Sequence, residues 1–319
     1  MMSTGPGGPQ VGQVDAAPVP RRTGGAPARR APHRHRTTPG RWVREIGWRH
    51  LVGLSAVAFA LFPVVWIVSA SVNPTSTLSG QQVVPTNPTL DNFRALFDTG
   101  FWTWFRNSMV VAGTGALGTV LLAALAAYAF SRLRFSGRRA GLLSLVLVQM
   151  FPQLLAFVAI YLMMIAIGDV APAIGTGTIS GLILVYLGGA MGVNTWLIKG
   201  FFDTIPKDLD ESALVDGATH WQVYSRIIMP LAAPILAVVG LLAFVTILND
   251  FVIANAVLSQ DEDSWTLSIG LFRYIDDRYG ARWGPFSAGA VIGSIPTVLL
   301  FMYLQRYIVS GLTQGSVKG

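Results

Sequence analysis

The 319-residue sequence contains no cysteine, and only 12% of its residues are charged. The lack of cysteine excludes a disulfide framework, a thiolate metal site and a cysteine nucleophile. Soluble domains carry about 25% charged residues, so this low charge content argues against an ordinary soluble domain. The sequence is instead rich in apolar residues, which make up 52% of it and give a mean hydropathy of +0.52. This composition predicts a membrane protein.

Motifs for catalysis and nucleotide binding are also missing. The phosphate-binding pattern G-x-x-x-x-G-K-S/T is absent, so we do not expect this chain to hydrolyse ATP itself. One G-x-G-x-x-G pattern, Gly113–Gly118, lies in an apolar run without a preceding strand, where small-residue helix packing explains it better. The four histidines (His33, His35, His50 and His220) lack the spacing of metal ligands. We therefore expect no catalytic residue, no metal and no cofactor.

Six apolar runs are long enough to cross about 30 Å of hydrocarbon as helices of about 20 residues. They are Leu51–Val72, Ser108–Phe130, Ala140–Ile167, Ile179–Ile198, Leu231–Leu258 and Phe286–Ile308. Pro63 and Pro152 lie inside two of these runs and predict kinks rather than breaks, because neighbouring helices can satisfy the freed carbonyls. The sequence predicts an all-α membrane protein with six transmembrane helices.

The basic residues are unevenly distributed on the two sides of these runs. Eighteen of the 23 Lys and Arg precede Leu51, lie in segments 131–139 and 199–226, or lie near the C-terminus. The other five are Arg94, Arg106, Arg273, Arg278 and Arg282. Because cytoplasmic loops carry the excess of Lys and Arg, we expect both termini and the 203–230 loop in the cytoplasm of a multi-pass protein of the cell (inner or plasma) membrane.

Residues 1–49 are rich in Pro, Gly, Ala and Arg and show no hydrophobic periodicity. Such a segment cannot bury enough surface to offset the entropy lost on ordering, so it is predicted to be a disordered cytoplasmic tail that precedes a transmembrane domain over residues 50–319. Its basic clusters raise the question of nucleic acid. Contact with the anionic headgroups of the lipid bilayer explains them better, and no nucleic-acid partner is expected.

The polar segment between the fourth and fifth runs has its own helical pattern. Pro206 suits the first turn of a helix, and Asp208, Asp210 and Glu211 interact favourably with the dipole near that end. Gly217 would let the chain turn, after which Trp221, Tyr224, Ile228 and Leu231 recur at helical spacing. The segment therefore predicts two short helices in a rigid, bent arrangement. Periodicity alone equally allows an amphipathic segment on the headgroups.

The sequence E-S-A-L-V-D-G-A at Glu211–Ala218, followed by I-I-M-P at Ile227–Pro230, resembles the "EAA" loop of membrane subunits in binding-protein-dependent ABC importers. Ser212 and Met229 depart from the usual Ala and Leu, which are small changes. The resemblance covers about residues 50–319 and extends to segments 194–206 and 248–251, which are similar to carbohydrate-uptake permeases. Residues 311–319 resemble the C-terminal tail of the six-span maltose/maltodextrin type.

This resemblance implies the fold of an ABC type I importer permease, with contacts to a dimer of ABC ATPase subunits. The residues that match the ATPase-coupling loop are Glu211, Ala213, Asp216, Gly217, Ala218, Ile227 and Pro230. Gly315 and Lys318 lie in the tail that reaches the ATPase in the maltose type. The resemblance further implies a second homologous permease chain, because six spans supply half of a pathway.

Several polar residues lie inside the predicted spans. Asp250 stands in the fifth run beside Asn249. An ionisable group at the centre of a span costs about 2.5–3.5 kcal/mol and is often functional. The sequence is compatible either with a role of Asp250 in lining the pathway or in packing, or with a position at the membrane interface. Gln149, Gln153 and Asn194 are the other polar side chains. They can hydrogen-bond either a sugar hydroxyl or a neighbouring helix.

Segment 259–285 on the opposite side is long, partly acidic and aromatic. It is either a solvated loop or, by the resemblance, a contact for an extracytoplasmic sugar-binding protein. Together these features predict a subunit of an ATP-driven sugar importer, with maltose/maltodextrin as the expected substrate and trehalose or another oligosaccharide as alternatives. The rival from another class is an ion-coupled secondary transporter that uses Asp250.

Overall fold

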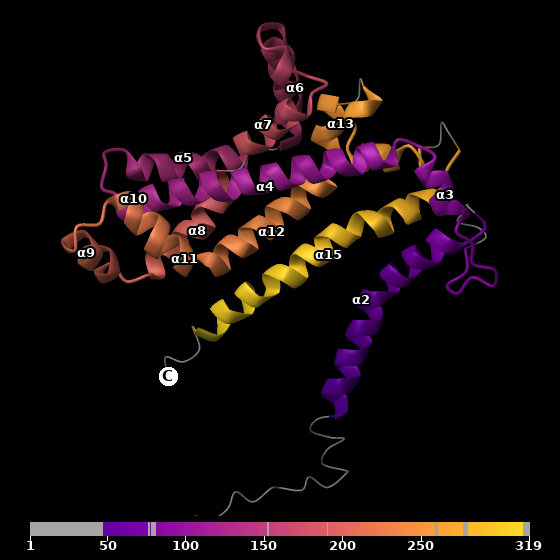
Figure 1. Ribbon diagram of the computed structural model, residues 1–319, viewed down its shortest axis with the longest axis horizontal. Helices are drawn as coiled ribbons and strands as arrows, with labels where there is room; N and C mark the ends of the chain where they lie inside the picture. The colour runs from indigo at the N-terminus through magenta and orange to yellow at the C-terminus, as the bar shows by residue number, and fades with distance from the viewer. Residues whose placement is uncertain are drawn as a thin grey trace, which may run out of the picture. The chain divides into compact units, whose positions relative to one another are not determined.

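The computed structural model describes residues 47–75, 77, 81–151, 153–189, 191–258, 261–276 and 280–314, and the regular secondary structure in these ranges is helical. Contacts divide the chain into two units, Met1–Val57 and Ala58–Gly319. Because the described residues begin at 47, most of the predicted tail (residues 1–49) lies outside them. The second unit holds the packed helices drawn from violet to yellow in Figure 1.

Four helices belong wholly or partly to the second unit. They are α2 (Trp48–Val72), α4 (Phe101–Arg132), α12 (Ala233–Asn249) and α15 (Trp283–Gln314). The remaining elements are α3 (Asp91–Phe97), α5 (Arg138–Met150), α6 (Gln153–Val170), η3 (Pro172–Ile174), α7 (Ile179–Gly189), α8 (Gly192–Thr204), α9 (Asp208–Val215), α10 (His220–Val223), η4 (Tyr224–Ile228), α11 (Met229–Leu231), α13 (Val252–Leu258), η5 (Glu262–Ser264) and α14 (Leu267–Phe272).

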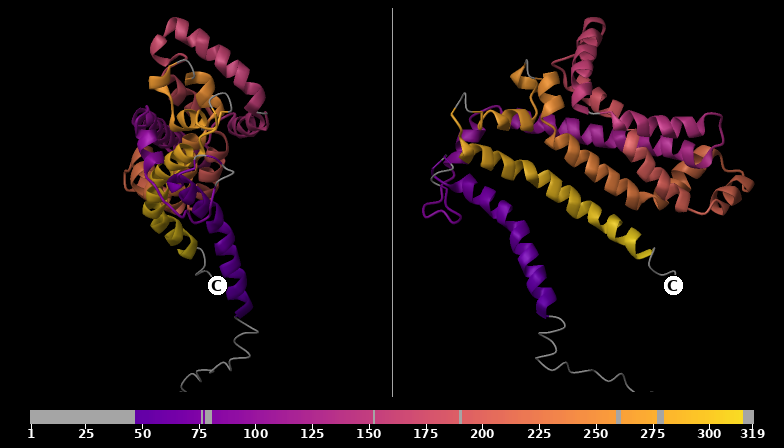
Figure 2. Two further views of the ribbon diagram at one scale, coloured as in Figure 1. Left: turned by 90° about the vertical axis from the view of Figure 1, so that its right-hand side faces the viewer. Right: turned by 180° about the vertical axis from the view of Figure 1, so that it is seen from behind.

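Helix α4 is the central element, packed against α12, α8 and α7, while α12 also packs against α15 (Figures 1 and 2). The buried face of α4 consists largely of small residues, which let neighbouring backbones approach closely. A Cβ on Gly118 would lie 2.4 Å from Leu187 Cδ2, and one on Gly115 would lie 2.8 Å from Ile247 Cδ1. Gly115 and Gly118 of the glycine pattern at 113–118 therefore serve helix packing, whereas a Cβ on Gly113 would meet no described atom within 4 Å.

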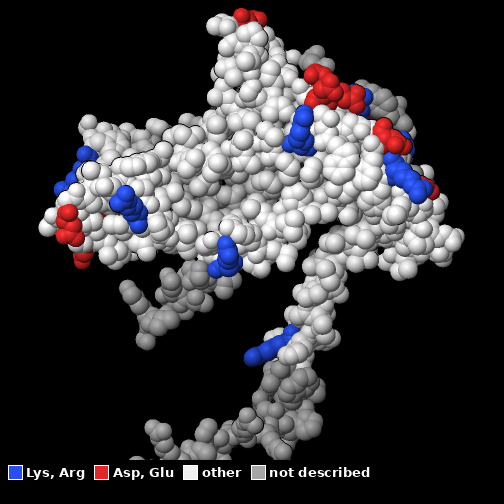
Figure 3. Space-filling model, in the orientation of Figure 1, with Lys and Arg blue, Asp and Glu red and all other residues white. Residues whose placement is uncertain are grey.

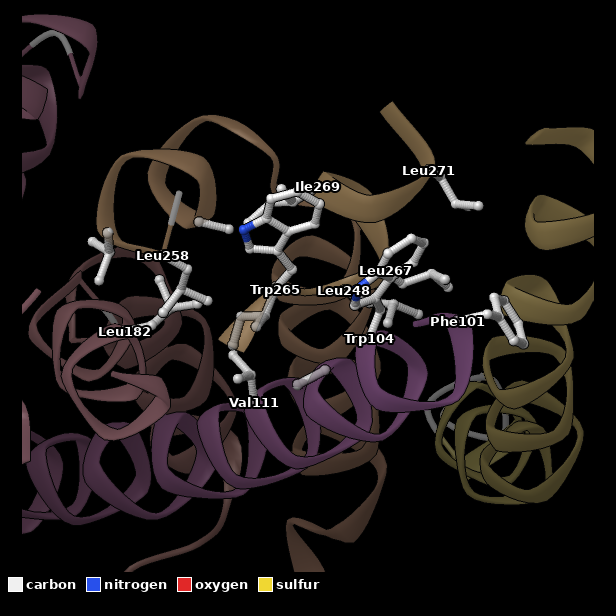
Figure 4. Packing of buried hydrophobic residues seen from close by; sticks show 14 of the residues in the cluster. Phe101, Trp104, Val111, Leu182, Leu248, Leu258, Trp265, Leu267, Ile269 and Leu271 are labelled. Carbon is white, nitrogen blue, oxygen red and sulfur yellow. The ribbon is translucent and has the colours of Figure 1, made fainter. Parts of the chain in front are cut away.

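Two clusters of buried apolar side chains lie along α4. The first surrounds its N-terminal half, where Trp104 and Trp265 pack with ring centroids 5.9 Å apart (Figure 4). The second surrounds its C-terminal half and includes Tyr128, Phe202 and Tyr224. The first cluster fixes segment 261–276 on α4, and the second fixes the 203–230 loop at its other end.

The three longest helices contain the first, second and sixth predicted spans. Among the described residues, α2, α4 and α15 are long and apolar enough to cross a membrane, and two bent helix pairs bring the number to five if each pair is one span. The six-span count and the cytoplasmic position of both termini stay predictions. Pro63 lies inside continuous α2, so the helix is not broken there.

The other predicted spans are interrupted, which corrects the expectation of continuous helices. The third span consists of α5 and α6; Pro152 lies outside the described residues, but Phe151 before it is extended, as the steric demand of a following proline favours. The fourth consists of α7 and α8, bent by 51°. The fifth ends at Asn249, and the chain bends by 77° between His220–Leu231 and α12.

Candidate functional site

The 203–230 loop begins with helix α9, which starts directly after Pro206 and Lys207. Its first turn contains Asp208, Asp210 and Glu211, and no side chain of the described residues caps the N-terminus by a hydrogen bond. Negative charge near the unpaired N–H groups of this end is favourable because of the helix dipole. The acidic first turn is thus confirmed, whereas Pro206 lies two residues before the first helical residue and not in the first turn as expected.

Gly217 ends α9 with φ of +85°, a conformation that residues with a Cβ rarely adopt. The Ala218 N–H donates to Ala213 O at 2.9 Å, and the Gly217 N–H donates to Leu214 O at 3.1 Å. This pair of bonds is a Schellman motif, which satisfies carbonyls at the helix end. The predicted turn at Gly217 is confirmed, and its geometry is set by backbone bonds.

Helix α10 follows directly, and a capping box satisfies the N–H groups at its N-terminus. The Gln222 N–H donates to Thr219 Oγ1 at 3.3 Å, and the Thr219 N–H donates to Gln222 Oε1 at 2.7 Å. The chain then makes the π-helical turn η4 before α11, where Pro230 stands in the first turn. Two short helices joined by a hydrogen-bonded turn are thus confirmed, and the rigidity of the loop stays a prediction.

The residues predicted for coupling do not all face the same way. Glu211, Asp216, Gly217 and Pro230 are exposed, whereas Ala213, Ala218 and Ile227 are partly buried. Ala213 and Ala218 pack against the second cluster, within the chain itself. The surface that the loop presents outward is therefore acidic and polar at Glu211 and Asp216, with the two alanines supporting it from below.

Val215 and Trp221 are the most exposed of the large apolar side chains described on this loop, at 88% and 64%, and Leu209 and Leu214 are exposed to 43% and 37%. The predicted helical face that includes Trp221 is split, because Tyr224 and Ile228 are buried while Trp221 and Leu231 are exposed. The wider π turn breaks the 3.6-residue period in this stretch. Periodicity alone could not predict this split.

The C-terminal turn of α4 holds the loop in place. Arg132 Nε lies 2.5 Å from Asp210 Oδ2, and Arg132 Nη2 donates to Ile205 O at 2.9 Å. Ser131 Oγ donates to Asp203 Oδ1 at 2.6 Å. Burial raises the pKa of the Asp210 carboxyl above its usual value, while the Arg132 guanidinium opposes that shift. From the sequence, Arg132 contributes to membrane orientation and Asp210 interacts with the helix dipole, and no local pattern pairs the two residues.

Three of the predicted pathway residues line one cavity of about 1150 Å³ among α4, α5, α6, α7, α8 and α12. These are Gln149, Asn194 and Asp250. Asn249 does not line it, since its side chain is exposed and bonds to Val245 O at 2.8 Å in its own helix. The side chain of Gln153 lies outside the described residues.

Asp250 occupies the break between α12 and α13. Its Oδ1 accepts hydrogen bonds from the Tyr186 hydroxyl and from the backbone N–H groups of Ile253 and Ala254, each at 3.0 Å. The carboxylate thus caps the first turn of α13, where N–H groups have no partner within the helix. The prediction that Asp250 lies inside a continuous span is therefore wrong, because α12 ends at Asn249 and α13 begins at Val252.

Segment 261–276 is tied to the N-terminal half of α4, far from the 203–230 loop. Asn107 Nδ2 donates to Asp263 O at 2.8 Å and to Trp265 O at 3.0 Å, and the Leu267 N–H donates to Ser108 Oγ at 2.7 Å. On the face shown in Figure 3, most charged side chains lie over the two ends of the helical layer. Gly315 and Lys318 lie outside the described residues.

The helices of the second unit are largely apolar and partly broken, and a helical loop connects α8 to α12, which defines a multi-pass helical membrane protein. Residues 119–314 match the family model of binding-protein-dependent transport system inner membrane components. The chain belongs to this family, and its place is the membrane.

The chain is similar to characterised permease proteins over most of its length. The galactooligosaccharides transport system permease protein GanQ of Bacillus subtilis (strain 168) is 38% identical over 283 residues, which cover 88% of this chain and 97% of GanQ. The maltose/maltodextrin transport system permease protein MalG of Escherichia coli (strain K12) is 36% identical over 286 residues, which cover 85% of this chain and 95% of MalG.

The fold also matches a solved structure. A bacterial ABC transporter involved in the import of the acidic polysaccharide alginate contains a chain with a TM-score of 0.70 and 22% sequence identity, and the match covers 85% of this chain and 98% of that chain. At this identity the match concerns the fold alone.

Proposed function

We propose that this chain is the transmembrane subunit of an ATP-driven, binding-protein-dependent importer of oligosaccharides, and that it forms half of the translocation pathway. The observation that carries the proposal is the rigid 203–230 loop with its exposed acidic and apolar side chains. A flexible loop could not transmit force, whereas a loop held by a Schellman motif, a capping box and a buried ion pair can.

In this function the loop contacts an ATPase subunit. Glu211, Asp216 and Gly217 are exposed on it, and Val215 adds an apolar side chain that a partner can cover. Ala213 and Ala218 keep the helix close to the chain's own core, while Ile227 and Pro230 lead the chain back towards α12. ATP hydrolysis belongs to the partner, because this sequence has no phosphate-binding motif of its own.

The cavity lined by Gln149, Asn194 and Asp250 is the proposed part of the pathway within this chain. Its mostly apolar lining with a few polar groups is typical of small-molecule sites. Its volume of about 1150 Å³ lies just above the range of about 300–1,000 Å³ for such sites. Room of this size suits an oligosaccharide better than a single ion.

Four further partners complete the proposal. A second homologous permease chain supplies the other half of the pathway, and the lipid bilayer surrounds the domain of residues 50–319. An extracytoplasmic sugar-binding protein delivers the substrate to segment 259–285. A second ATPase subunit forms the dimer that the C-terminal residues Gly315 and Lys318 approach. The basic tail of residues 1–49 lies beside the headgroups.

Maltose/maltodextrin is the substrate that we propose, and a galactooligosaccharide is the second candidate. Both are named because the sequence identities of this chain to MalG and to GanQ are similar, at 36% and 38%. The test is purification of the tagged chain with its native partners and reconstitution in liposomes. ATP hydrolysis is then measured with binding protein and maltotriose, a galactooligosaccharide or trehalose. We expect stimulation by maltotriose.

The coupling role is tested in the same assay with Glu211→Ala combined with Gly217→Pro. This double variant should lose the ATPase or its stimulation, whereas Asp208→Ala, an exposed change on the same helix, should keep both. If only another sugar stimulated ATP hydrolysis, maltose/maltodextrin would be refuted as the substrate, but the importer function would not. Transport by the purified chain alone, driven by an ion gradient, would instead support a secondary transporter that uses Asp250.

A further inference from the structure

One turn of α4 contacts nearly every element of the 203–230 loop. Arg132 joins α9 through Asp210 and the end of α8 through Ile205 O. In the same turn, the Tyr128 hydroxyl donates to His220 O at 3.2 Å, and its ring packs edge-on against Tyr224 with centroids 5.1 Å apart. The loop is thus attached sideways to α4 as well as along the chain.

The ion pair at the centre of this attachment is buried. The side chains of Arg132 and Asp210 are 5% and 12% exposed. Among the described residues, Arg132 Nη1 and Asp210 Oδ1 have no hydrogen-bond partner, and Arg132 Nε contacts Asp210 Oδ2 as an ion pair without a hydrogen bond. An incompletely bonded buried ion pair holds two helices together no better than apolar side chains of similar volume. Stability alone therefore does not explain why charges stand here.

Charges differ from apolar side chains in fixing an orientation. An apolar contact tolerates sliding and rotation, whereas separating or misaligning this pair leaves an uncompensated charge in a buried place. Helix α4 runs without a break from Phe101 to Arg132, and Thr119 on it lines the cavity. At 1.5 Å per residue, Thr119 lies about 20 Å along the helix from Arg132. A movement of α9 that carries Arg132 with it moves a wall of the cavity.

We propose that the Arg132–Asp210 pair is the positioning link that passes movement of the 203–230 loop to α4 and so to the cavity. The inference rests on the proposed function, since it concerns how contact with an ATPase reaches the pathway. The two residues are positioning residues that touch neither nucleotide nor sugar.

The experiment compares Arg132→Met, Asp210→Leu and the double variant in the reconstituted complex. Two quantities are measured: the thermal midpoint of the complex and the ratio of sugar-stimulated to unstimulated ATP hydrolysis. Each single variant should lower both, because it leaves one buried charge unpaired. The double variant should recover the thermal midpoint while its ratio stays at least about fivefold below wild type, the lower bound of typical couplings between sites.

The matched control is Arg94→Met, which breaks the pair of Arg94 and Asp91 within α3. These side chains are 78% and 71% exposed, so both quantities should stay at wild-type values. Recovery of both quantities in the double variant would show that the pair only holds the fold and would overturn the proposal. So would an unchanged ratio in the single variants. Absence of stimulation in the wild type would instead refute the proposed function.

Discussion

Replacing Gly217 by alanine should loosen the end of α9 through backbone strain alone. A Cβ at this position would meet no atom within 4 Å, so no steric clash contributes. Holding an alanine at φ of +85° costs about 1–2 kcal/mol. The smaller backbone entropy of the unfolded chain offsets about 0.4–1 kcal/mol of this cost. The net change is about 1 kcal/mol, which corresponds to an increase of about fivefold in local opening.

The assay is amide hydrogen exchange of the Ala218 N–H, which closes the Schellman motif on Ala213 O. Gly217→Ala should speed this exchange, and Gly217→Asn should change it little, because asparagine tolerates the left-handed region. The matched control is Gly200→Ala in α8, where a Cβ also meets nothing but the backbone is helical. Alanine there should stabilise its helix by up to about 1 kcal/mol. Equal exchange in the two alanine variants would refute the argument from strain.

Three further changes test other parts of the structure. Asn107→Leu leaves two backbone carbonyls of segment 261–276 without their donor; it should cost about 2–4 kcal/mol, measured by thermal unfolding in detergent, and a loss below about 0.5 kcal/mol would contradict those bonds. Asp250→Ala should destabilise the start of α13 by about 1 kcal/mol, and Asp250→Asn should not, because asparagine still caps; equal hydrogen exchange in the two variants would contradict the cap. Gly181→Ala would bring a Cβ within 2.4 Å of a backbone carbonyl and should cost about 1–3 kcal/mol. Gly188→Ala, whose Cβ meets no described atom within 4 Å in helix α7, should leave the thermal midpoint unchanged or raise it slightly.

The sequence predicts much of the helical layer because length and hydropathy are strong signals for helices that cross lipid. Gly217 and Pro206 also carry local information, since each restricts the backbone in a way that does not depend on distant residues. This is why the bent shape of the 203–230 loop follows from its own residues.

Contacts between distant residues could not be predicted in the same way. The pairing of Arg132 with Asp210 joins residues 78 positions apart, and nothing in either local sequence indicates the other. The breaks at Phe151 and Asp250 lie within apolar runs, where hydropathy stays high whether or not the helix is continuous. The end of α12 at Asn249 depends on the bonds that Asp250 makes with Tyr186 and with α13.

The π turn η4 sets the rotational register between the 203–230 loop and α12. A π turn holds one residue more than an α-helical turn, so this stretch accommodates an extra residue without disturbing the elements on either side. If the same residues formed a regular α-helix instead, the extra residue would rotate Val215 and Trp221 by about 100° relative to α12, because each residue of an α-helix turns the chain by that angle. A chimaera that exchanges this loop between two permeases must therefore carry Tyr224–Ile228 as a unit, and both junctions belong outside it.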